Sequence, residues 1–135
     1  MEAATKDQVP SFTAKERAAR SFTAIFREYG FEGASLTMLS EASGLGRSSL
    51  YHHFPKGKAD MGAAALADMH GWFRVNVFDV LHGKEPVQDR LYKASDRLTK
   101  YYQSGKLPCL MEIFSRGEAR ALYRAELQAF LSDFL

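Results

Sequence analysis

This sequence contains little cysteine, little excess of either charge and no long apolar run. Its single cysteine, Cys109, excludes a disulfide framework or a zinc cluster built within one chain, and it favours a reducing setting. No apolar run approaches the roughly 18–20 residues that span a bilayer. The first residues, MEAATKDQVPSF, contain no apolar signal core. We therefore expect a soluble, cytoplasmic protein.

The charge balance is mild. The 135 residues carry a net charge of +2, which does not by itself indicate nucleic-acid binding. Residues 1–58 contain 8 Lys and Arg against 6 Asp and Glu, whereas residues 59–135 contain 10 of each, so the small basic excess lies in the amino-terminal part. A hydrophobic content of 46% is ordinary for a globular chain and predicts one modest domain or two closely packed lobes.

The basic excess gathers around residues 44–58, GLGRSSLYHHFPKGK. Gly44 and Gly46 allow a tight turn, and Pro55 breaks helical structure, so a helix of about two turns is predicted over residues 47–53. A helix this short is unstable alone in water and must be held by its neighbours. Residues 47–58 contain no acid. A short, acid-free helix after a glycine turn is typical of the second helix of a helix-turn-helix.

The helical period assigns faces to this short helix. A rotation of 100° per residue puts Leu50 and Phe54 on one inward stripe. Ser48 and His52 then point outward, Ser49 and Tyr51 lie on the shoulders, and Arg47 and His53 lie nearer the buried edge. The outward face is polar, hydrogen-bonding and aromatic.

The rest of the sequence also predicts helices, because no stretch shows a sustained period of two bounded by hairpin turns. Thr13 and Glu16 match a capping box that opens a helix ending at Gly30, and Ser35 caps a second, short helix. Residues 30–33 are expected to form a loop. Further helices are predicted over residues 58–81, from 87 to about 104, in a short apolar segment at 109–114, and over 119–134. We predict an all-α fold of about seven helices.

An ordered set of residues extends the helix-turn-helix pattern over residues 12–61. Its members are Phe26, Tyr29 to Phe31, Ser35 to Thr37, Leu39, Glu41 to Leu45, Ser49 to Phe54 and Lys58. This spacing resembles the amino-terminal domain of the TetR family (tetracycline repressor-like) of transcriptional regulators. The sequence PKGK at residues 55–58 is similar to a subgroup of that family. Gly46 departs from the serine that is common at its position, which removes one phosphate contact.

The resemblance implies a homodimeric repressor with a flexible arm (residues 1–12), a helix-turn-helix domain that binds double-stranded operator DNA (13–57) and a helical effector-binding domain (58–135). The effector implied is a small hydrophobic ligand, with no cofactor and no enzymatic activity. The sequence itself contains no nucleophile motif or phosphate loop. The alternative is a helical interaction module that keeps the fold without binding DNA.

Family members usually carry two further long helices that form the dimer bundle, whereas this sequence ends at Leu135 in mid-pattern. We expect that this chain is a fragment, that the remainder of its sequence is missing, or that it dimerises in a different way.

Nine residues are predicted to contact DNA: Ser35, Thr37, Arg47, Ser48, Ser49, Tyr51, His52, His53 and Lys58. Ser48, Tyr51 and His52 face the groove, where they can meet base edges or phosphates. Arg47 pairs either with guanine or with a phosphate, and both interpretations stay open. Lys58 begins the next helix, so its ammonium and that helix's free amides can hold one phosphate together. Ser35 and Thr37 can do the same at the second helix, although Ser35 also fits a plain N-cap.

The effector pocket implied by the resemblance has eight candidate residues: His70, Trp72, Phe73, Tyr101, Tyr102, Cys109, Met111 and Phe114. Sequence alone favours an ordinary core role for each. No metal site is predicted, because the adjacent His52 and His53 point 100° apart on a helix and no Cys or acid lies nearby.

Overall fold

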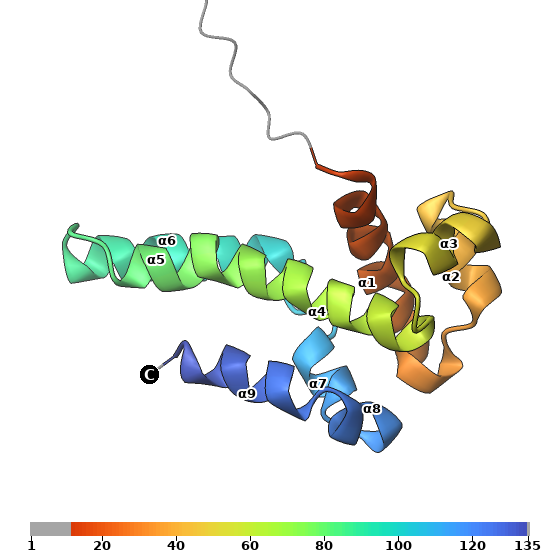
Figure 1. The fold of residues 1–135 in the computed structure, drawn as a ribbon. Helices are drawn as coiled ribbons and strands as arrows, with labels where there is room; N and C mark the ends of the chain where they lie inside the picture. Colours follow the sequence, from red (N-terminus) through yellow and green to blue (C-terminus); the bar gives the residue numbers. More distant parts are fainter. Residues whose placement is uncertain (1–11, 135) are drawn as a thin grey trace, which may run out of the picture.

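The structure is a computed structural model that describes residues 12–134, and in this range it contains helices and no strand (Figure 1). The elements are α1 (Ala14–Gly33), α2 (Leu36–Ser43), α3 (Arg47–His53), α4 (Lys58–Phe73), the π-helical turn η1 (Arg74–Phe78), α5 (Asp79–Leu81), α6 (Val87–Tyr101), α7 (Leu110–Phe114), α8 (Gly117–Leu122) and α9 (Arg124–Ser132). The predicted all-α fold is confirmed. Of the predicted arm, all but Phe12 lies outside the described residues.

Helix α1 begins at the predicted capping box. The Thr13 amide donates to Glu16 Oε2 at 2.7 Å, and the Glu16 amide donates to Thr13 Oγ1 at 3.1 Å. The predicted loop over residues 30–33 is wrong, because the chain continues as a further helical turn after a kink at Gly30 (φ 75°, ψ 175°). Glycine tolerates this positive φ. The kink redirects the chain so that Phe31 is buried in the core.

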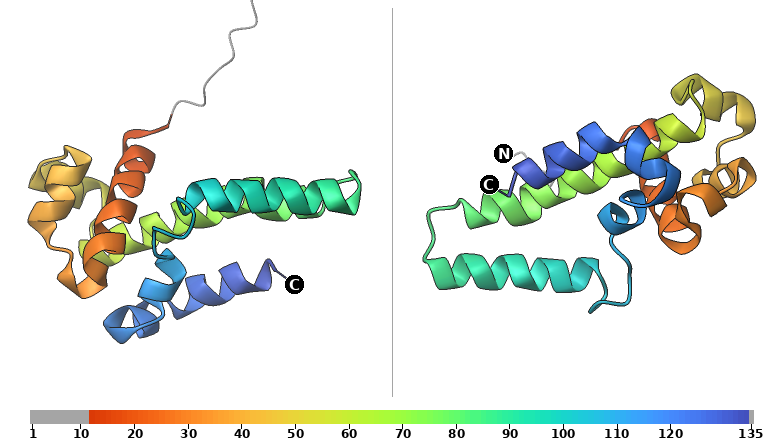
Figure 2. Two further views of the ribbon diagram at one scale, coloured as in Figure 1. Left: turned by 180° about the vertical axis from the view of Figure 1, so that it is seen from behind. Right: turned by 90° about the horizontal axis from the view of Figure 1, so that it is seen from below.

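Helix α4, η1 and α5 form one continuous rod over the predicted range of residues 58–81 (Figure 1). The π-helical turn coincides with Val75 and Val77, whose β-branched side chains weaken helical propensity. Helix α6 runs back beside the rod, and α9 lies along α4 on another side (Figure 2). No helix within residues 12–134 combines the length and the apolarity needed to cross a membrane.

The single carboxy-terminal helix predicted over residues 119–134 is also wrong. The chain breaks at Tyr123 (φ −113°, ψ 21°), which separates α8 from α9. The Tyr123 ring stacks on Phe114 with centroids 5.0 Å apart, and its hydroxyl donates to the Ala59 carbonyl at 2.6 Å. These contacts dock the break against the start of α4.

One contiguous core joins the amino-terminal helices to the rest of the chain. Phe26 of α1 meets Phe114 of α7 edge to face with centroids 5.2 Å apart, and Phe31 meets Tyr123 at 5.6 Å. Since such aromatic pairs add to the free energy of apolar burial, helices α1–α3 are held firmly against the carboxy-terminal helices.

Candidate nucleic-acid interface

The corner between α2 and α3 is built by glycines and by serines. Gly44 ends α2, as the sequence predicts, and it does so in the left-handed conformation (φ 71°, ψ 8°). Ser40 Oγ donates to the Leu45 carbonyl at 2.6 Å, and the Leu45 amide donates to Ser43 Oγ at 3.3 Å. Ser40 is not among the residues singled out from the sequence, and Ser43 appears there only as a member of the family pattern. Short hydroxyl side chains beside a turn typically bond to its backbone.

Helix α3 is anchored by the predicted stripe. Leu50 and Phe54 are fully buried, with 1% and 0% of their surface exposed. The Phe54 ring meets Phe22 of α1 edge to face, with centroids 5.2 Å apart. This packing supplies the support that a seven-residue helix lacks by itself.

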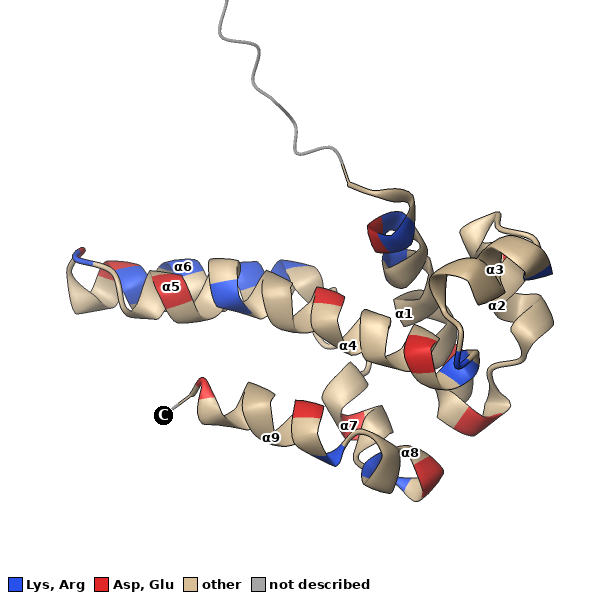
Figure 3. Cartoon of the chain, in the orientation of Figure 1, with Lys and Arg blue, Asp and Glu red and all other residues tan. Residues whose placement is uncertain are grey.

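The opposite face of α3 is open. Ser48, Ser49, Tyr51 and His52 are exposed, whereas His53 is half-buried. Arg47, which the helical period puts nearer the buried edge, is also exposed. Figure 3 shows one basic segment and no acidic segment on the α3 ribbon. The face therefore offers hydroxyl, phenol, imidazole and guanidinium groups without a carboxylate that would repel phosphates.

Three predicted contact residues lie outside α3. Ser35 Oγ accepts from the Met38 amide at 3.1 Å, so it is an N-cap of α2. Thr37 is exposed in the first turn of the same helix. Lys58 Nζ donates to the carbonyls of Ala34 (3.2 Å) and Glu32 (3.4 Å), a structural role that the sequence does not predict.

Lys58 thus closes the carboxyl end of α1, where unpaired carbonyls favour a cation. Its Nζ also lies 4.7 Å from the centroid of the Phe31 ring. An ammonium has three donors, and these two carbonyls engage two of them.

The helix-turn-helix is tied to the carboxy-terminal helices by polar contacts as well. Glu32 Oε1 accepts from the Glu118 amide at 2.7 Å, which caps the start of α8. Tyr123, between α8 and α9, supplies a second tie, to the start of α4 directly after the helix-turn-helix, through its bond to the Ala59 carbonyl. The two ties join residues 86 and 64 positions apart in the chain, so no local sequence signal marks them.

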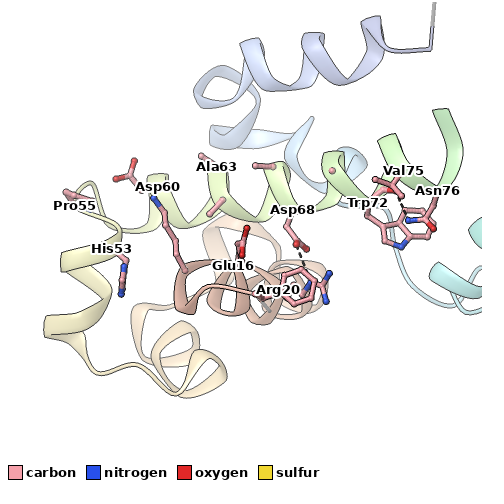
Figure 4. A pocket seen from close by; sticks show the side chains of 16 residues that line it. Glu16, Arg20, His53, Pro55, Asp60, Ala63, Asp68, Trp72, Val75 and Asn76 are labelled. Atoms are coloured by element: carbon pink, nitrogen blue, oxygen red, sulfur yellow. Dashed lines mark hydrogen bonds and ion pairs between the residues drawn. The ribbon is translucent and has the colours of Figure 1, made fainter. Parts of the chain in front are cut away.

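A groove of about 860 Å³ lies between α1 and the α4–η1 rod (Figure 4). Of the eight predicted pocket residues, only Trp72 borders it. A second, smaller cavity of about 160 Å³ is bordered by His70 and Met111. The other five, Phe73, Tyr101, Tyr102, Cys109 and Phe114, border neither of these two cavities.

Packing explains this difference. Phe73 and Phe114 are buried in the core. The Tyr101 ring stacks on Trp72 with centroids 3.9 Å apart, and the Tyr102 hydroxyl donates to Cys109 Sγ at 3.2 Å. Burial, together with the Cys109 thiol, raises the pKa of Tyr102 well above its ordinary value.

Helices α1–α3, with a glycine turn between two short helices and a polar face on the second, form a helix-turn-helix. Residues 23–65 match the family described as "Bacterial regulatory proteins, tetR family". Over 67 residues the chain is 30% identical to the HTH-type transcriptional regulator LmrA of Bacillus subtilis (strain 168), a stretch that covers 50% of this chain and 36% of that relative. A search of solved structures finds no match. The chain therefore carries a TetR-type helix-turn-helix domain, followed by further helices.

Proposed function

We propose that this chain is a DNA-binding transcriptional regulator of the TetR type, a repressor that leaves its operator when a small hydrophobic ligand binds. One observation carries the DNA-binding part. Helix α3 buries Leu50 and Phe54 while it exposes Tyr51, His52 and Arg47 on an acid-free face. A rigid helix with polar side chains on its open face fits the major groove of B-DNA.

The proposed contacts divide by chemistry. Ser48, Tyr51 and His52 meet base edges, with Ser49 and the half-buried His53 beside them. Arg47 pairs with a guanine or a phosphate at the start of α3. The free amides of the first turn of α2, next to Ser35 and Thr37, hold a phosphate on the other side, because a helix amino terminus attracts anions. Lys58 keeps its third donor for a phosphate.

Two copies of the chain are needed for operator binding. A helix of seven residues contacts only a few base pairs, so it gives little specificity alone. Helix-turn-helix dimers bind half-sites about 34–36 Å apart. We propose a homodimer in the cytoplasm, with no cofactor and no enzymatic activity.

The ties between the two parts of the chain support ligand control. Lys58, Glu32 and Tyr123 join α1, α4 and α8 at one corner, beside the helix-turn-helix. A ligand that binds one arrangement of these helices better than another shifts the DNA-competent population.

Salt-dependent DNA binding tests the proposal. Fluorescence anisotropy with a pool of labelled duplexes should give a binding constant that falls linearly on a plot of log K against log salt. Arg47→Ala should flatten this slope by about 0.9 if the Arg47 side chain neutralises one phosphate. Arg120→Ala, which removes an exposed arginine from α8, is the matched control and should leave the slope unchanged. Absence of duplex binding at low salt would favour the interaction module instead.

A further inference from the structure

The groove between α1 and the α4–η1 rod is long, and its floor is made of small side chains. It extends from Asp60 to Asn76, about 24 Å at 1.5 Å per residue. The small residues of the floor are Ala19, Ala63, Ala64, Ala67 and Gly71. A Cβ added to Gly71 would meet no atom within 4 Å, so the space above this residue is open. The volume of about 860 Å³ lies in the range of small-molecule sites.

One end of the groove is acidic and aromatic. Asp68 and Trp72 lie one turn apart on the same face of the rod (Figure 4). Trp72 stacks on Tyr101 and also borders the groove. Glu16 of α1 adds a second carboxylate to the lining. This end therefore combines two carboxylates and the Arg20 guanidinium with an aromatic ring.

The charge of Asp68 is only partly balanced. Arg20 Nε lies 3.4 Å from Asp68 Oδ1, which is long for a charge-assisted hydrogen bond. The Arg20 guanidinium lies over the Phe12 ring at 3.7 Å from its centroid. Asp68 Oδ2 accepts no hydrogen bond within residues 12–134. Burial raises the pKa of Asp68 in spite of Arg20 and of Arg27, whose guanidinium lies over the Tyr101 ring, and Glu16 adds to the rise, so a further cation would stabilise the carboxylate.

The other end of the groove reaches the helix-turn-helix. His53 and Pro55, after the end of α3, border it together with Lys15 of α1 and Asp60 of α4. The Asp60 carboxylate accepts from the Lys56 amide at 2.9 Å. Lys15 Nζ lies 5.6 Å from the centroid of the Phe54 ring, which anchors α3. Figure 4 shows His53 and Pro55 at the opposite end from Trp72. A molecule in the groove thus lies between two helices that both support α3.

We propose that this groove is the effector site of the regulator and that it takes a flat aromatic cation, with its ring on the alanine floor against Trp72 and its charge beside Asp68. The regulatory part of this assignment rests on the proposed function. A cation over an indole ring and next to a carboxylate gains from both. The small floor residues leave room for a flat ring.

The same geometry couples the ligand to DNA binding. Helix α1 holds α3 through the Phe22–Phe54 contact, and only four residues separate the end of α3 from the start of α4. A ring inserted between α1 and α4 changes their spacing and with it the orientation of α3. The affinity for DNA therefore falls when the groove is filled.

Three matched probes test the ligand class: N-methylacridinium (cation), acridine at pH 8 (neutral) and acridine-9-carboxylate (anion). Trp72 is the only tryptophan of the chain, so quenching of its fluorescence reports on the groove, and calorimetry checks the affinities. We expect the cation to bind about tenfold more tightly than acridine. Equal affinities, or tighter binding of the anion, overturn the proposal.

Charge and shape variants locate the site. Asp68→Asn should reduce the preference for the cation to less than about twofold, and Arg20→Gln, which removes the competing guanidinium, should increase it. Asp89→Asn on the exposed start of α6 is the control for net charge. Gly71→Leu should block all three probes, whereas Gly71→Ala should not. A preference that survives Asp68→Asn overturns the assignment.

The regulatory part is tested separately. At the same concentration, N-methylacridinium should weaken duplex binding by the unchanged chain more than duplex binding by the Asp68→Asn variant. Because the dye binds the DNA equally in both titrations, the difference between the two proteins reports only on the groove. An equal response in both proteins overturns the effector role. If the chain binds the cation through Asp68 but binds no duplex at any salt concentration, the ligand site stands and the proposed function fails.

Discussion

Two glycines of α4 provide a sharp test of how the carboxy-terminal helices dock on the rod. A Cβ at Gly62 would collide with the hydroxyl of Tyr123 and lie 2.7 Å from its Cζ, whereas a Cβ at Gly71 would meet nothing within 4 Å. The same change, glycine to alanine in the same helix, therefore meets opposite surroundings.

Alanine in a helix interior is favoured over glycine by about 1 kcal/mol. At Gly71 this gain is unopposed, so Gly71→Ala should raise the free energy of unfolding by about 0.5–1 kcal/mol. At Gly62 the extra methyl group costs about 1–3 kcal/mol of overpacking. Displacing Tyr123 also breaks its bond to Ala59, worth about 0.5–1.5 kcal/mol. Gly62→Ala should therefore be destabilising by about 1–3 kcal/mol.

Urea unfolding followed by circular dichroism measures both variants against the unchanged chain. The double variant Gly62→Ala with Tyr123→Phe removes the colliding hydroxyl and should regain part of the lost stability, which a double-mutant cycle reports as a coupling energy. If Gly62→Ala is as stable as Gly71→Ala, then Tyr123 does not dock against α4 in this way.

Two further predictions concern charged side chains. Folding raises the pKa of Asp68 above its ordinary value of 3.8, so the ionised carboxylate is penalised in the folded state. Asp68→Asn should therefore increase stability at pH 7, and the gain should shrink as the pH falls through the raised pKa and disappear well below 3.8, where Asp68 is protonated in both states. A gain that is independent of pH in urea titrations from pH 7 to 4 contradicts this. Lys58→Ala should lower the free energy of unfolding by about 1–2 kcal/mol, because it removes two charge-assisted bonds at the end of α1. If stability is unchanged and the salt slope of DNA binding is flatter, Lys58 binds a phosphate and does not support the end of α1.

Local signals predict the amino-terminal helices well. The capping box at Thr13, the N-cap at Ser35 and the helix end at Gly44 each act within a few residues, so the sequence reveals them directly. The Leu50 and Phe54 anchor follows from the helical period alone. The residues of α3 outside this buried stripe form its exposed polar face. That this face binds DNA stays a prediction.

Long-range packing determines the features that the sequence does not predict. Tyr123 breaks a helical pattern because its hydroxyl has a partner on α4, 64 residues away along the chain, and its ring has a partner on α7. The groove arises where Arg20 and Asp68, 48 residues apart, come together. The apolar period predicts α6 correctly, yet two of its members, Val87 and Leu91, are exposed, because the period does not tell which helix packs against them.

One pair of variants tests most directly whether the open face of α3 binds duplex DNA. Tyr51→Glu puts a negative charge on that face, and Tyr92→Glu makes the identical change on α6, where the side chain is 74% exposed. Anisotropy titrations with duplex DNA at several salt concentrations compare both with the unchanged chain. We expect Tyr51→Glu to weaken binding at least tenfold and Tyr92→Glu to leave it unchanged. Equal affinities for the two variants would contradict DNA binding by this face.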